Sequence, residues 1–272
     1  MIVLLRGGGD LASGVAYRLH RAGLPVVITE IAQPLMVRRT VSFGEAVYRG
    51  VTVVEGVTAR LVGGSPALGA AFTAGEIPVL VDPDASILNL LHPAILVDAR
   101  MTKRAPDLGL DAAALVIGLG PGFSAGQNCH AVIETNRGHY LGRVIWDGSP
   151  QPDTGLPDEV KDRQEERVLR APVDGILIGK AQIGDLLEPG QPVAEISGQM
   201  ILAPFRGVLR GLIHPGIAVR RGLKIGDLDP RADSRYIQYL SDKSLAVGGG
   251  VLEAILTRPE IRLRLWQAHG AE

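Results

Sequence analysis

The sequence has a single cysteine, few aromatic residues and no excess of charge of either sign. One cysteine, Cys129, cannot form an internal disulfide, which favours a reducing compartment. With 28 basic and 29 acidic side chains, the net charge of −1 gives no general attraction for nucleic acid or an anionic membrane. No apolar run approaches the roughly 18 residues of a membrane helix, and MIVLLRGGGD does not resemble a signal peptide. We expect a cytoplasmic protein with neither a nucleic-acid nor a membrane partner.

Glycine and proline, in contrast, are abundant. The chain of 272 residues contains 35 glycines and 18 prolines, which indicates many tight turns and close backbone approaches. Its length allows one large or two medium domains with a buried core.

Short runs rich in Val and Ile alternate with helical patterns in the first half of the chain. The expected strands are Ile2–Leu5, Pro25–Thr29, Val51–Val54, Pro78–Val81, Ala94–Val97 and Ala114–Ile117, and Leu11–Ala22 is the first expected helix. Such alternation is typical of βαβ units around a parallel sheet. The sequence therefore predicts an α/β fold, with a Rossmann-like parallel-sheet domain over residues 1–150.

The second half contains an internal repeat. After a Pro-rich and charged stretch that we expect to be a linker (151–167), residues 168–232 match themselves at an offset of 32, pairing Ala171-Pro172 with Ala203-Pro204 and Gly175 with Gly207. The pattern resembles the all-β barrel-sandwich fold of biotinyl and lipoyl carrier domains. The hairpin expected at 194–199 has no lysine, so we expect neither biotin nor lipoate there. Residues 233–272 are expected to form C-terminal helices.

The first glycine turn fits the G-x-G-x-x-(G/A) fingerprint that follows a strand and opens a helix. In this pattern one glycine permits the turn, the next lets the backbone approach a pyrophosphate, and the helix N-terminus supplies free amides. A carboxylate at the end of the second strand could bind a ribose hydroxyl. The alternative is a turn that only joins strand to helix. The candidate ligand-binding residues here are Gly7, Gly8, Gly9, Asp10, Ser13 and Glu30.

A second glycine-rich turn follows the strand expected at Ala114–Ile117. Gly118, Gly120 and Gly122 could form an anion-binding nest at the same sheet edge, or a purely structural loop.

The segment 128–139 is dense in polar groups. Cys129 beside His130 could be a thiolate of lowered pKa, and His130 could converge with Glu134 if they share a strand face. A hairpin could bring His139 toward the first strand, and Asn136 joins the candidate ligand-binding residues. Alternatively, Cys129 is a small buried apolar residue and the histidines lie in loops. The spacing matches no standard zinc site, so we expect no metal.

Two charged clusters complete the set of candidates. Arg38 and Arg39 could neutralise ligand phosphates or form a solvated pair. The acidic and basic residues at 227–233 are expected to form a turn with internal salt links.

The sequence resembles a known family at RGGGDLASGVAYRLHRAGLPVVITE, VRRTVSFGEAVY, VIGLGPGFSAGQNCHAVIETNRGH, LKIGDLDPR and SDKSLAVGGGVLEAIL. It is similar to the accessory proteins of selenium-dependent molybdenum hydroxylases (YqeB type). The resemblance implies a role in maturing or supplying the cofactor of hydroxylases of the xanthine dehydrogenase kind. The family commonly has Asp-Cys-His where this chain has Asn128-Cys129-His130, so a role for an acid at that position does not carry over.

Three hypotheses follow from these observations. The first is an accessory protein that binds a molybdopterin-type nucleotide and handles sulfur or selenium through Cys129, with a molybdenum hydroxylase as its partner. The second is an oxidoreductase that uses NAD(P), and the third is a docking scaffold without a ligand. Whether the chain forms a homo-oligomer, and whether it is an enzyme, stay open.

Overall fold

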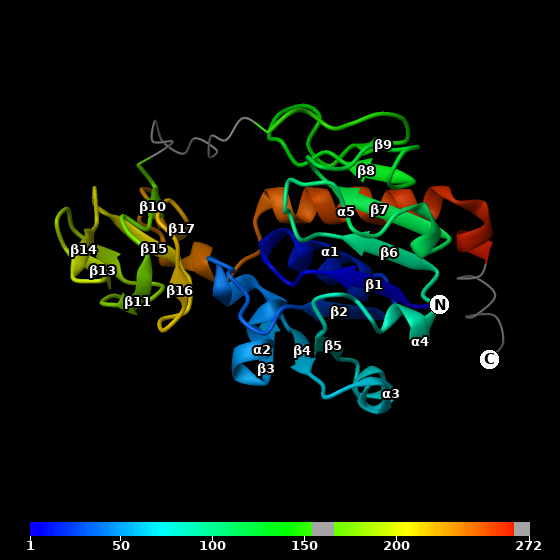
Figure 1. The fold of residues 1–272 in the computed structure, drawn as a ribbon, viewed down its shortest axis with the longest axis horizontal. Coiled ribbons are helices and arrows are strands. Elements are labelled where there is room, and N and C mark those ends of the chain that lie inside the picture. The colour runs from blue at the N-terminus through cyan, green and yellow to red at the C-terminus, as the bar shows by residue number, and fades with distance from the viewer. Residues whose placement is uncertain (154–165, 264–272) are drawn as a thin grey trace. The chain divides into compact units, whose positions relative to one another are not determined.

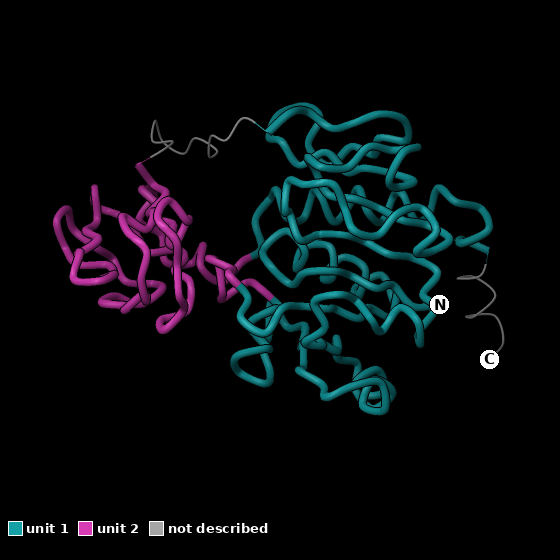
Figure 2. Tube along the Cα trace, viewed as in Figure 1, with its two compact units in different colours: residues 1–34, 43–153, 240–272 teal, residues 35–42, 154–239 magenta. Residues whose placement is uncertain are grey.

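The computed structural model describes residues 1–153 and 166–263, and it divides the chain into two compact units (Figures 1 and 2). Unit 1 comprises Met1–Pro34, Phe43–Asp153 and Leu240–Glu272, and unit 2 comprises Leu35–Ser42 and Thr154–Tyr239. Most of the predicted linker lies outside the described residues. The predicted C-terminal segment is shared, because residues 233–239 belong to unit 2 and the rest to unit 1.

Unit 1 is built on a nine-stranded sheet of order β3-β4-β5-β2-β1-β6-β7-β8-β9. The strands are β1 (Val3–Arg6), β2 (Val26–Glu30), β3 (Val51–Val54), β4 (Val57–Leu61), β5 (Ile77–Val81), β6 (Ile95–Asp98), β7 (Leu115–Leu119), β8 (Ala131–Ile133) and β9 (Val144–Ile145). The helices are α1 (Asp10–Arg21), α2 (Ala46–Arg49), α3 (Leu68–Thr73), α4 (Leu88–Leu91) and α5 (Asp242–Thr257), with short 3-10 turns η2 (Phe43–Glu45), η3 (Ser65–Ala67) and η4 (Leu110–Ala112). In the order of the sheet, each pair of neighbouring strands between β4 and β8 is parallel. At the two edges, β3 pairs with β4 and β8 pairs with β9 in antiparallel fashion.

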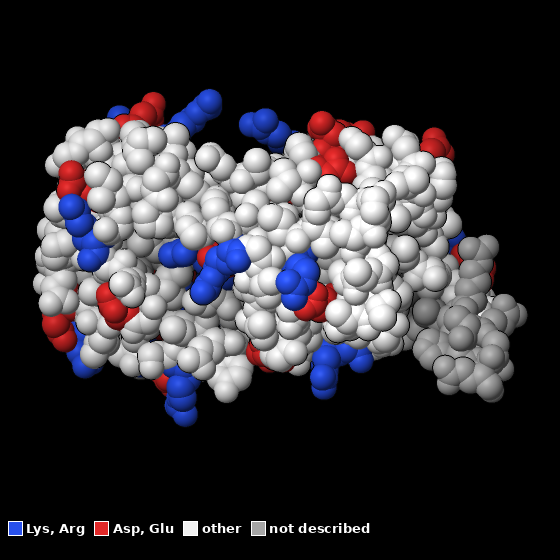
Figure 3. All heavy atoms as spheres, turned by 90° about the horizontal axis from the view of Figure 1, so that it is seen from below, with Lys and Arg blue, Asp and Glu red and all other residues white. Residues whose placement is uncertain are grey.

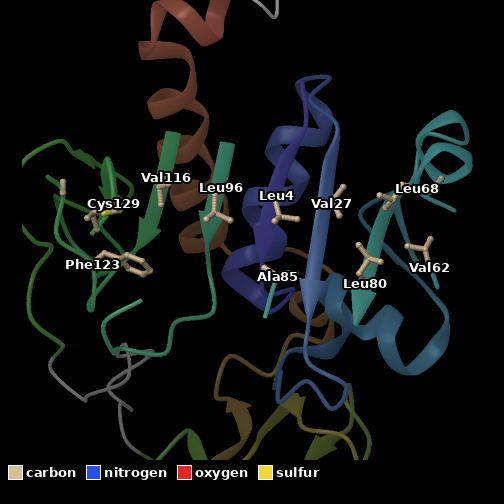
Figure 4. Close-up of a cluster of buried hydrophobic side chains, with 13 residues drawn as sticks. Leu4, Val27, Val62, Leu68, Leu80, Ala85, Leu96, Val116, Phe123 and Cys129 are labelled. Carbon is tan, nitrogen blue, oxygen red and sulfur yellow. The ribbon is translucent and has the colours of Figure 1, made fainter. Parts of the chain in front are cut away.

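One face of the unit 1 sheet buries a continuous apolar cluster (Figure 4). Leu4, Val27, Leu96 and Val116 come from four adjacent parallel strands, and Leu68 of α3 packs against the same cluster. Side chains alternate along a strand, so Val3 and Leu5 belong to the opposite face. That face is covered by α1 and α5 (Figure 1).

Small residues let α1 and α5 approach closely. A Cβ at Gly14 of α1 would overlap the backbone of Ser244, and a Cβ at Gly248 would lie 2.5 Å from the carbonyl oxygen of Gly14. The glycine-rich stretch of the C-terminal region therefore lies within one helix, where it serves helix packing. The side chain of Ser241 caps the N-terminus of α5 by accepting the amide of Ser244.

Unit 2 consists of two four-stranded antiparallel sheets, of order β10-β17-β15-β12 and β14-β13-β11-β16. Its strands are β10 (Val168–Arg170), β11 (Gly175–Gly179), β12 (Leu186–Leu187), β13 (Pro192–Ile196), β14 (Gln199–Leu202), β15 (Gly207–Leu212), β16 (Ala218–Val219) and β17 (Lys224–Asp229), and its 3-10 turns are η1 (Arg39–Val41) and η5 (Ser234–Ile237). The sequence repeat appears in this order. The offset of 32 residues relates each strand of the first sheet to one strand of the second. In order, β10, β17, β15 and β12 correspond to β14, β13, β11 and β16. Each sheet therefore contains two strands from each half of the repeat.

The turn glycines of the repeat also match in conformation. Gly190 and Gly222 both have φ of 83°, and Gly184 and Gly216 have φ of 105° and 86°. A side chain at any of these positions would force an L-residue into the left-handed region, which explains why the repeat retains glycine.

The predicted fold class, a Rossmann-like parallel sheet with a barrel-sandwich module and C-terminal helices, is wrong. The structure has one large mixed sheet with antiparallel pairs at both edges and two further antiparallel sheets, and it contains few helices. The connections from β6 to β7 and from β7 to β8 hold no α-helix among the described residues. Short Val- and Ile-rich runs identify strands but carry no signal for strand direction, and Gly and Pro in these two connections disfavour the helices that βαβ units require.

Charges of both signs are interspersed on the face drawn in Figure 3, without a large patch of one sign. No helix among residues 1–153 and 166–263 combines the length and apolar character needed to cross a membrane.

Candidate functional site

Four neighbouring parallel strands of unit 1 end at one edge of the sheet, and polar or glycine-rich residues follow each of them. The strands are β2, β1, β6 and β7, and the groups at their carboxyl ends are Glu30, Gly7–Gly9, Asp98 and Gly118–Gly122. Open α/β sheets bind ligands at this edge, so it is the candidate functional site.

The first glycine turn is held by protein contacts at one end and is open at the other. The amide of Gly7 donates to the carbonyl of Thr29, and Gly8 lies so close to Gly44 that a Cβ would approach the Gly44 nitrogen to 2.6 Å. Gly9, the N-cap of α1, differs, because a Cβ built there meets no heavy atom of the described residues within 4 Å. Backbone amides of the first helical turn have no acceptor within the helix. The turn therefore offers open backbone at Gly9.

The carboxylate of Glu30 stabilises the first glycine turn by accepting backbone hydrogen bonds. One carboxylate oxygen accepts the amide of Gly8 at 2.8 Å and the other accepts the amide of Ile31 at 2.8 Å. Burial raises the pKa of Glu30, while these two hydrogen bonds oppose the rise. A ribose hydroxyl would thus have to share oxygens that already accept backbone amides.

Asp10 and Ser13 are also engaged within the protein. Oδ1 of Asp10 accepts the hydroxyl of Ser244 in α5 at 2.7 Å, which directs the carboxylate toward α5. The hydroxyl of Ser13 donates to the carbonyl of Gly8 and accepts the amide of Phe43. Ser13 therefore positions the turn from its inner side.

The space around the second glycine turn is filled by other parts of the protein itself. A Cβ at Gly118 would overlap the ring of Phe123, and one at Gly120 would overlap the hydroxyl of Thr135. Gly122 has φ of 107°, and a Cβ there would lie 2.6 Å from the carbonyl oxygen of Arg104. Close packing accounts for these three glycines without a bound anion.

Cys129 is buried in the apolar cluster near Phe123 (Figure 4). Burial raises the pKa of the Cys129 thiol to about 11, so the expected thiolate of lowered pKa does not form at neutral pH. Nδ1 of His130 accepts the amide of Val116 at 2.9 Å, and burial lowers the pKa of His130. His130 thus joins two backbone segments as a neutral imidazole.

Glu134, Asn136 and His139 follow the carboxyl end of β8. The carboxylate of Glu134 accepts the amides of Asn136 and Gln151, each at 2.7 Å, and does not converge with His130. His139 is exposed in the β8–β9 connection, where Gly142 packs against Ala246 of α5. The predicted return of His139 toward the first strand is therefore not seen.

Sequence reasoning missed a cluster of ion pairs at the same edge. Arg6 ends β1, Asp98 ends β6, and Arg100 follows two residues later. The guanidinium of Arg100 lies 2.6 Å from Asp98 and 2.6 Å from Asp107, and that of Arg6 lies 2.7 Å from Asp107 and 3.6 Å from Asp98. The signal for Arg6 and Asp98 was their position at the carboxyl ends of strands.

The remaining charged candidates lie in unit 2. Arg38 donates to the carbonyls of Tyr236 and Tyr239, and Arg39 donates to the carbonyl of Leu212. Asp227 and Asp229 lie on β17 and not in a turn, and both are buried. Asp227 pairs with Arg167 and Arg210, and Asp229 pairs with Arg210 and Arg231. Of these pairs, only Asp229–Arg231 is internal to residues 227–233 as predicted, and the other pairs link β17 to residues outside this cluster.

Among the described residues, no group of three or more His, Cys, Asp or Glu side chains is placed to hold a metal ion.

Comparison with known proteins gives one relative of high similarity. The chain is 47% identical over 255 residues to "Uncharacterized protein YqeB" of Escherichia coli K12, in a match that covers 94% of this chain and 47% of that protein. The chain thus spans about half the length of this relative. No protein-family model matches the sequence. A solved succinylglutamate desuccinylase of Silicibacter sp. TM1040 aligns over 84% of both chains, but at 13% identity and a TM-score of 0.25 it assigns neither fold nor function. The chain is therefore similar to YqeB, as the sequence motifs indicate.

Proposed function

We propose that this chain binds a phosphate-bearing, nucleotide-like ligand at the carboxyl edge of the unit 1 sheet. The observation that carries this proposal is the open backbone at Gly9, the N-cap of the 12-residue helix α1, on the strand edge that also presents Arg6 and Arg100. A helix N-terminus favours anions through its free amides and its partial positive charge. Guanidinium groups add donors that match phosphate oxygens.

The resemblance of the sequence to accessory proteins of selenium-dependent molybdenum hydroxylases supports a role in maturing or supplying the cofactor of such an enzyme. A molybdopterin-type nucleotide contains a pyrophosphate, which suits the open backbone at Gly9 and the guanidinium groups of Arg6 and Arg100 at the same sheet edge. A role for Cys129 as a carrier of sulfur or selenium gains no support from its position, because the thiol is buried and protonated.

A thermal-shift screen tests ligand binding. ADP, NADH and a molybdopterin-type nucleotide are added to the wild type and to Gly9→Val, whose side chain would occupy the open space. A ligand at a hundred times its Kd stabilises the protein by about 2.7 kcal/mol, so a shift in the wild type that Gly9→Val loses supports the proposal. Gly69→Val is the matched control, because Gly69 also faces open space and lies within α3, outside the glycine turns and strand ends of this edge. The proposal fails if no ligand shifts the wild type, or if both variants respond as the wild type does.

Docking to a molybdenum hydroxylase is a second candidate function, favoured by an apolar surface in unit 2. Ile176 and Ile178 of β11 and Met200 and Leu202 of β14 are exposed to 45–50%. Both strands flank β13, and Ile178 and Met200 pair with the same residue, Glu195, so the side chains share one face. Exposed apolar patches of this kind mark interaction sites.

Binding to a purified molybdenum hydroxylase, measured by surface plasmon resonance, tests the docking function. Ile178→Asp is expected to weaken binding at least about ten-fold, which corresponds to about 1.4 kcal/mol. Leu90→Asp, at an exposed apolar residue of unit 1, is the control and is expected to bind as the wild type does. Equal affinity of wild type and Ile178→Asp would refute docking through this face.

A further inference from the structure

The carboxylate of Asp107 lies between two arginine side chains that both bind it with two nitrogens. Oδ1 accepts from Arg6 at 2.7 Å and from Arg100 at 2.6 Å. Oδ2 accepts from Arg6 at 3.0 Å and from Arg100 at 3.4 Å. Such paired contacts are the geometry with which arginine recognises the oxygens of a carboxylate or a phosphate.

The two arginines and Asp107 differ in how firmly the fold holds them. The side chain of Arg6 is 1% exposed at the end of a central strand, and Arg100 lies close to the strand end of β6, where Asp98 also binds it. Asp107, in contrast, is 55% exposed and lies in the connection between β6 and η4, which has no regular secondary structure. Two residues of this connection that are not glycine, Met101 and Lys103, have φ of 54° and 58°, in the left-handed region. The arginines are thus fixed, while the carboxylate reaches them from an exposed and strained connection.

Arg6 has a donor that Asp107 does not use. Its Nε is buried and has no hydrogen-bond partner among the described residues. Both oxygens of the Asp107 carboxylate already accept from terminal guanidinium nitrogens. Nη2 of Arg6 also donates to the carbonyl of Pro83 at 3.2 Å, so the protein itself holds this side chain in place. A phosphate group offers more acceptor oxygens than a carboxylate does, so it can replace both oxygens of Asp107 at the two guanidinium groups.

We propose that Arg6 and Arg100 form a binding site for a phosphate of the ligand, and that Asp107 occupies this site when the ligand is absent. The inference rests on the proposed function, because it assigns the phosphate site at the same sheet edge. The first glycine turn and Arg100 are neighbours at this edge, because a Cβ at Gly7 would lie 3.3 Å from the backbone nitrogen of Arg100. Binding would then release the carboxylate of Asp107 into solvent.

Occupancy by Asp107 lowers the apparent affinity for the ligand. The apparent Kd equals the intrinsic Kd divided by the fraction of molecules in which the site is vacant, so occupancy by Asp107 in nine molecules of ten raises the apparent Kd about ten-fold. Removing the Asp107 carboxylate is therefore expected to tighten phosphate binding, although it removes two ion pairs from the free protein.

Isothermal titration calorimetry with pyrophosphate and with ADP tests this expectation and separates a free diphosphate from a nucleotide. Asp107→Asn is expected to bind pyrophosphate about ten-fold more tightly than the wild type, and Arg100→Gln at least about ten-fold more weakly. Asp111→Asn is the matched control, because Asp111 is an exposed carboxylate in η4, directly after this connection. Equal or weaker binding by Asp107→Asn would overturn the inference.

Hydrogen exchange of the wild type gives a second measurement that needs no variant. Saturating pyrophosphate is expected to increase amide exchange around Asp107, and unchanged or slower exchange there would contradict displacement of Asp107. The two proposals fail separately. If nucleotides bind in a manner sensitive to Gly9→Val but Asp107→Asn leaves Kd unchanged, only the inference falls. If no nucleotide binds but Asp107→Asn gains affinity for pyrophosphate, only the proposed nucleotide function falls.

Discussion

Two adjacent glycines of α5 are expected to respond to the same substitution with opposite signs. A Cβ at Gly248 would lie 2.5 Å from the carbonyl oxygen of Gly14 in α1, whereas a Cβ at Gly249 meets no heavy atom of the described residues within 4 Å. Both positions lie inside the helix, so alanine gains about 1 kcal/mol of helix propensity over glycine at each. Only Gly248→Ala pushes against a neighbouring backbone.

The magnitude follows from this contact. Ordinary contact begins near 3.4 Å, so α1 and α5 would have to separate by about 1 Å around Gly248. Overpacking of this kind costs about 1–3 kcal/mol, and a backbone carbonyl cannot rotate away as a side chain can. We expect Gly249→Ala to stabilise the protein by up to about 1 kcal/mol and Gly248→Ala to destabilise it by up to about 2 kcal/mol.

Urea denaturation followed by circular dichroism at 222 nm provides the assay. Because helix propensity contributes equally to both variants, the difference between their free energies of unfolding isolates the packing cost, expected at about 1–3 kcal/mol. If both variants shift the midpoint by the same amount in the same direction, the reasoning about close packing of α1 on α5 is refuted.

Three further predictions follow from burial and charge. Because burial raises the pKa of Cys129 to about 11, iodoacetamide at pH 7.5 is expected to leave the native thiol unmodified and to alkylate it in urea; mass spectrometry that finds rapid native alkylation would contradict its burial. Burial opposes ionisation of Asp227, but the charges of Arg210, Lys224 and Arg167 outweigh this effect and lower the pKa of Asp227. The stability that this carboxylate adds is therefore fully present above pH 3.8, the ordinary pKa of Asp, and is lost as the pH falls through the lower pKa of the folded protein. Asp227→Asn should therefore be less stable than the wild type at pH 7, and the difference in denaturation midpoints should shrink below pH 3.8; a gap that does not change with pH would count against the ion pairs. Gly118→Ala is expected to destabilise unit 1 by about 1–3 kcal/mol, and a double-mutant cycle with Phe123→Ala should show a coupling of at least about 0.5 kcal/mol, with strict additivity as the opposing result.

Periodicity and repeats predicted the strands more successfully than the fold. The Val- and Ile-rich runs near the start correspond to β1 and β2, and the offset of 32 relates the strands of unit 2. The fold class could not be obtained in the same way, because antiparallel pairing of β3 with β4 and of β8 with β9 depends on where the chain turns back. Segment 35–42 joins unit 2 through contacts far along the chain, such as that of Arg38 with Tyr239, and local patterns do not encode such contacts.

The two glycine turns show why motif reasoning reached its limit at the site. In the sequence both turns follow a strand and both contain a G-x-G core. In the structure, Gly118 and Gly120 leave room for the side chains of Phe123 and Thr135, whereas Gly9 faces open space. A glycine pattern records that a Cβ is excluded, and it does not record what excludes it. Arg6 was missed for a related reason, because as the last residue of an apolar strand it had no partner within its local sequence, and Asp107 lies 101 residues away.

The charge balance of the ion-pair cluster bears on how this edge could accept an anion. In the free protein the charges of Arg6 and Arg100 are cancelled by those of Asp98 and Asp107, so the cluster has no net attraction for a phosphate. Departure of Asp107 leaves two guanidinium groups against one buried carboxylate, so the cluster itself gains a net charge of +1. Asp98 would keep Arg100 in place, because it binds that guanidinium from the strand end. The exposed carboxylate of Asp107 can therefore leave the site, while the buried carboxylate of Asp98 keeps Arg100 in position to bind the anion.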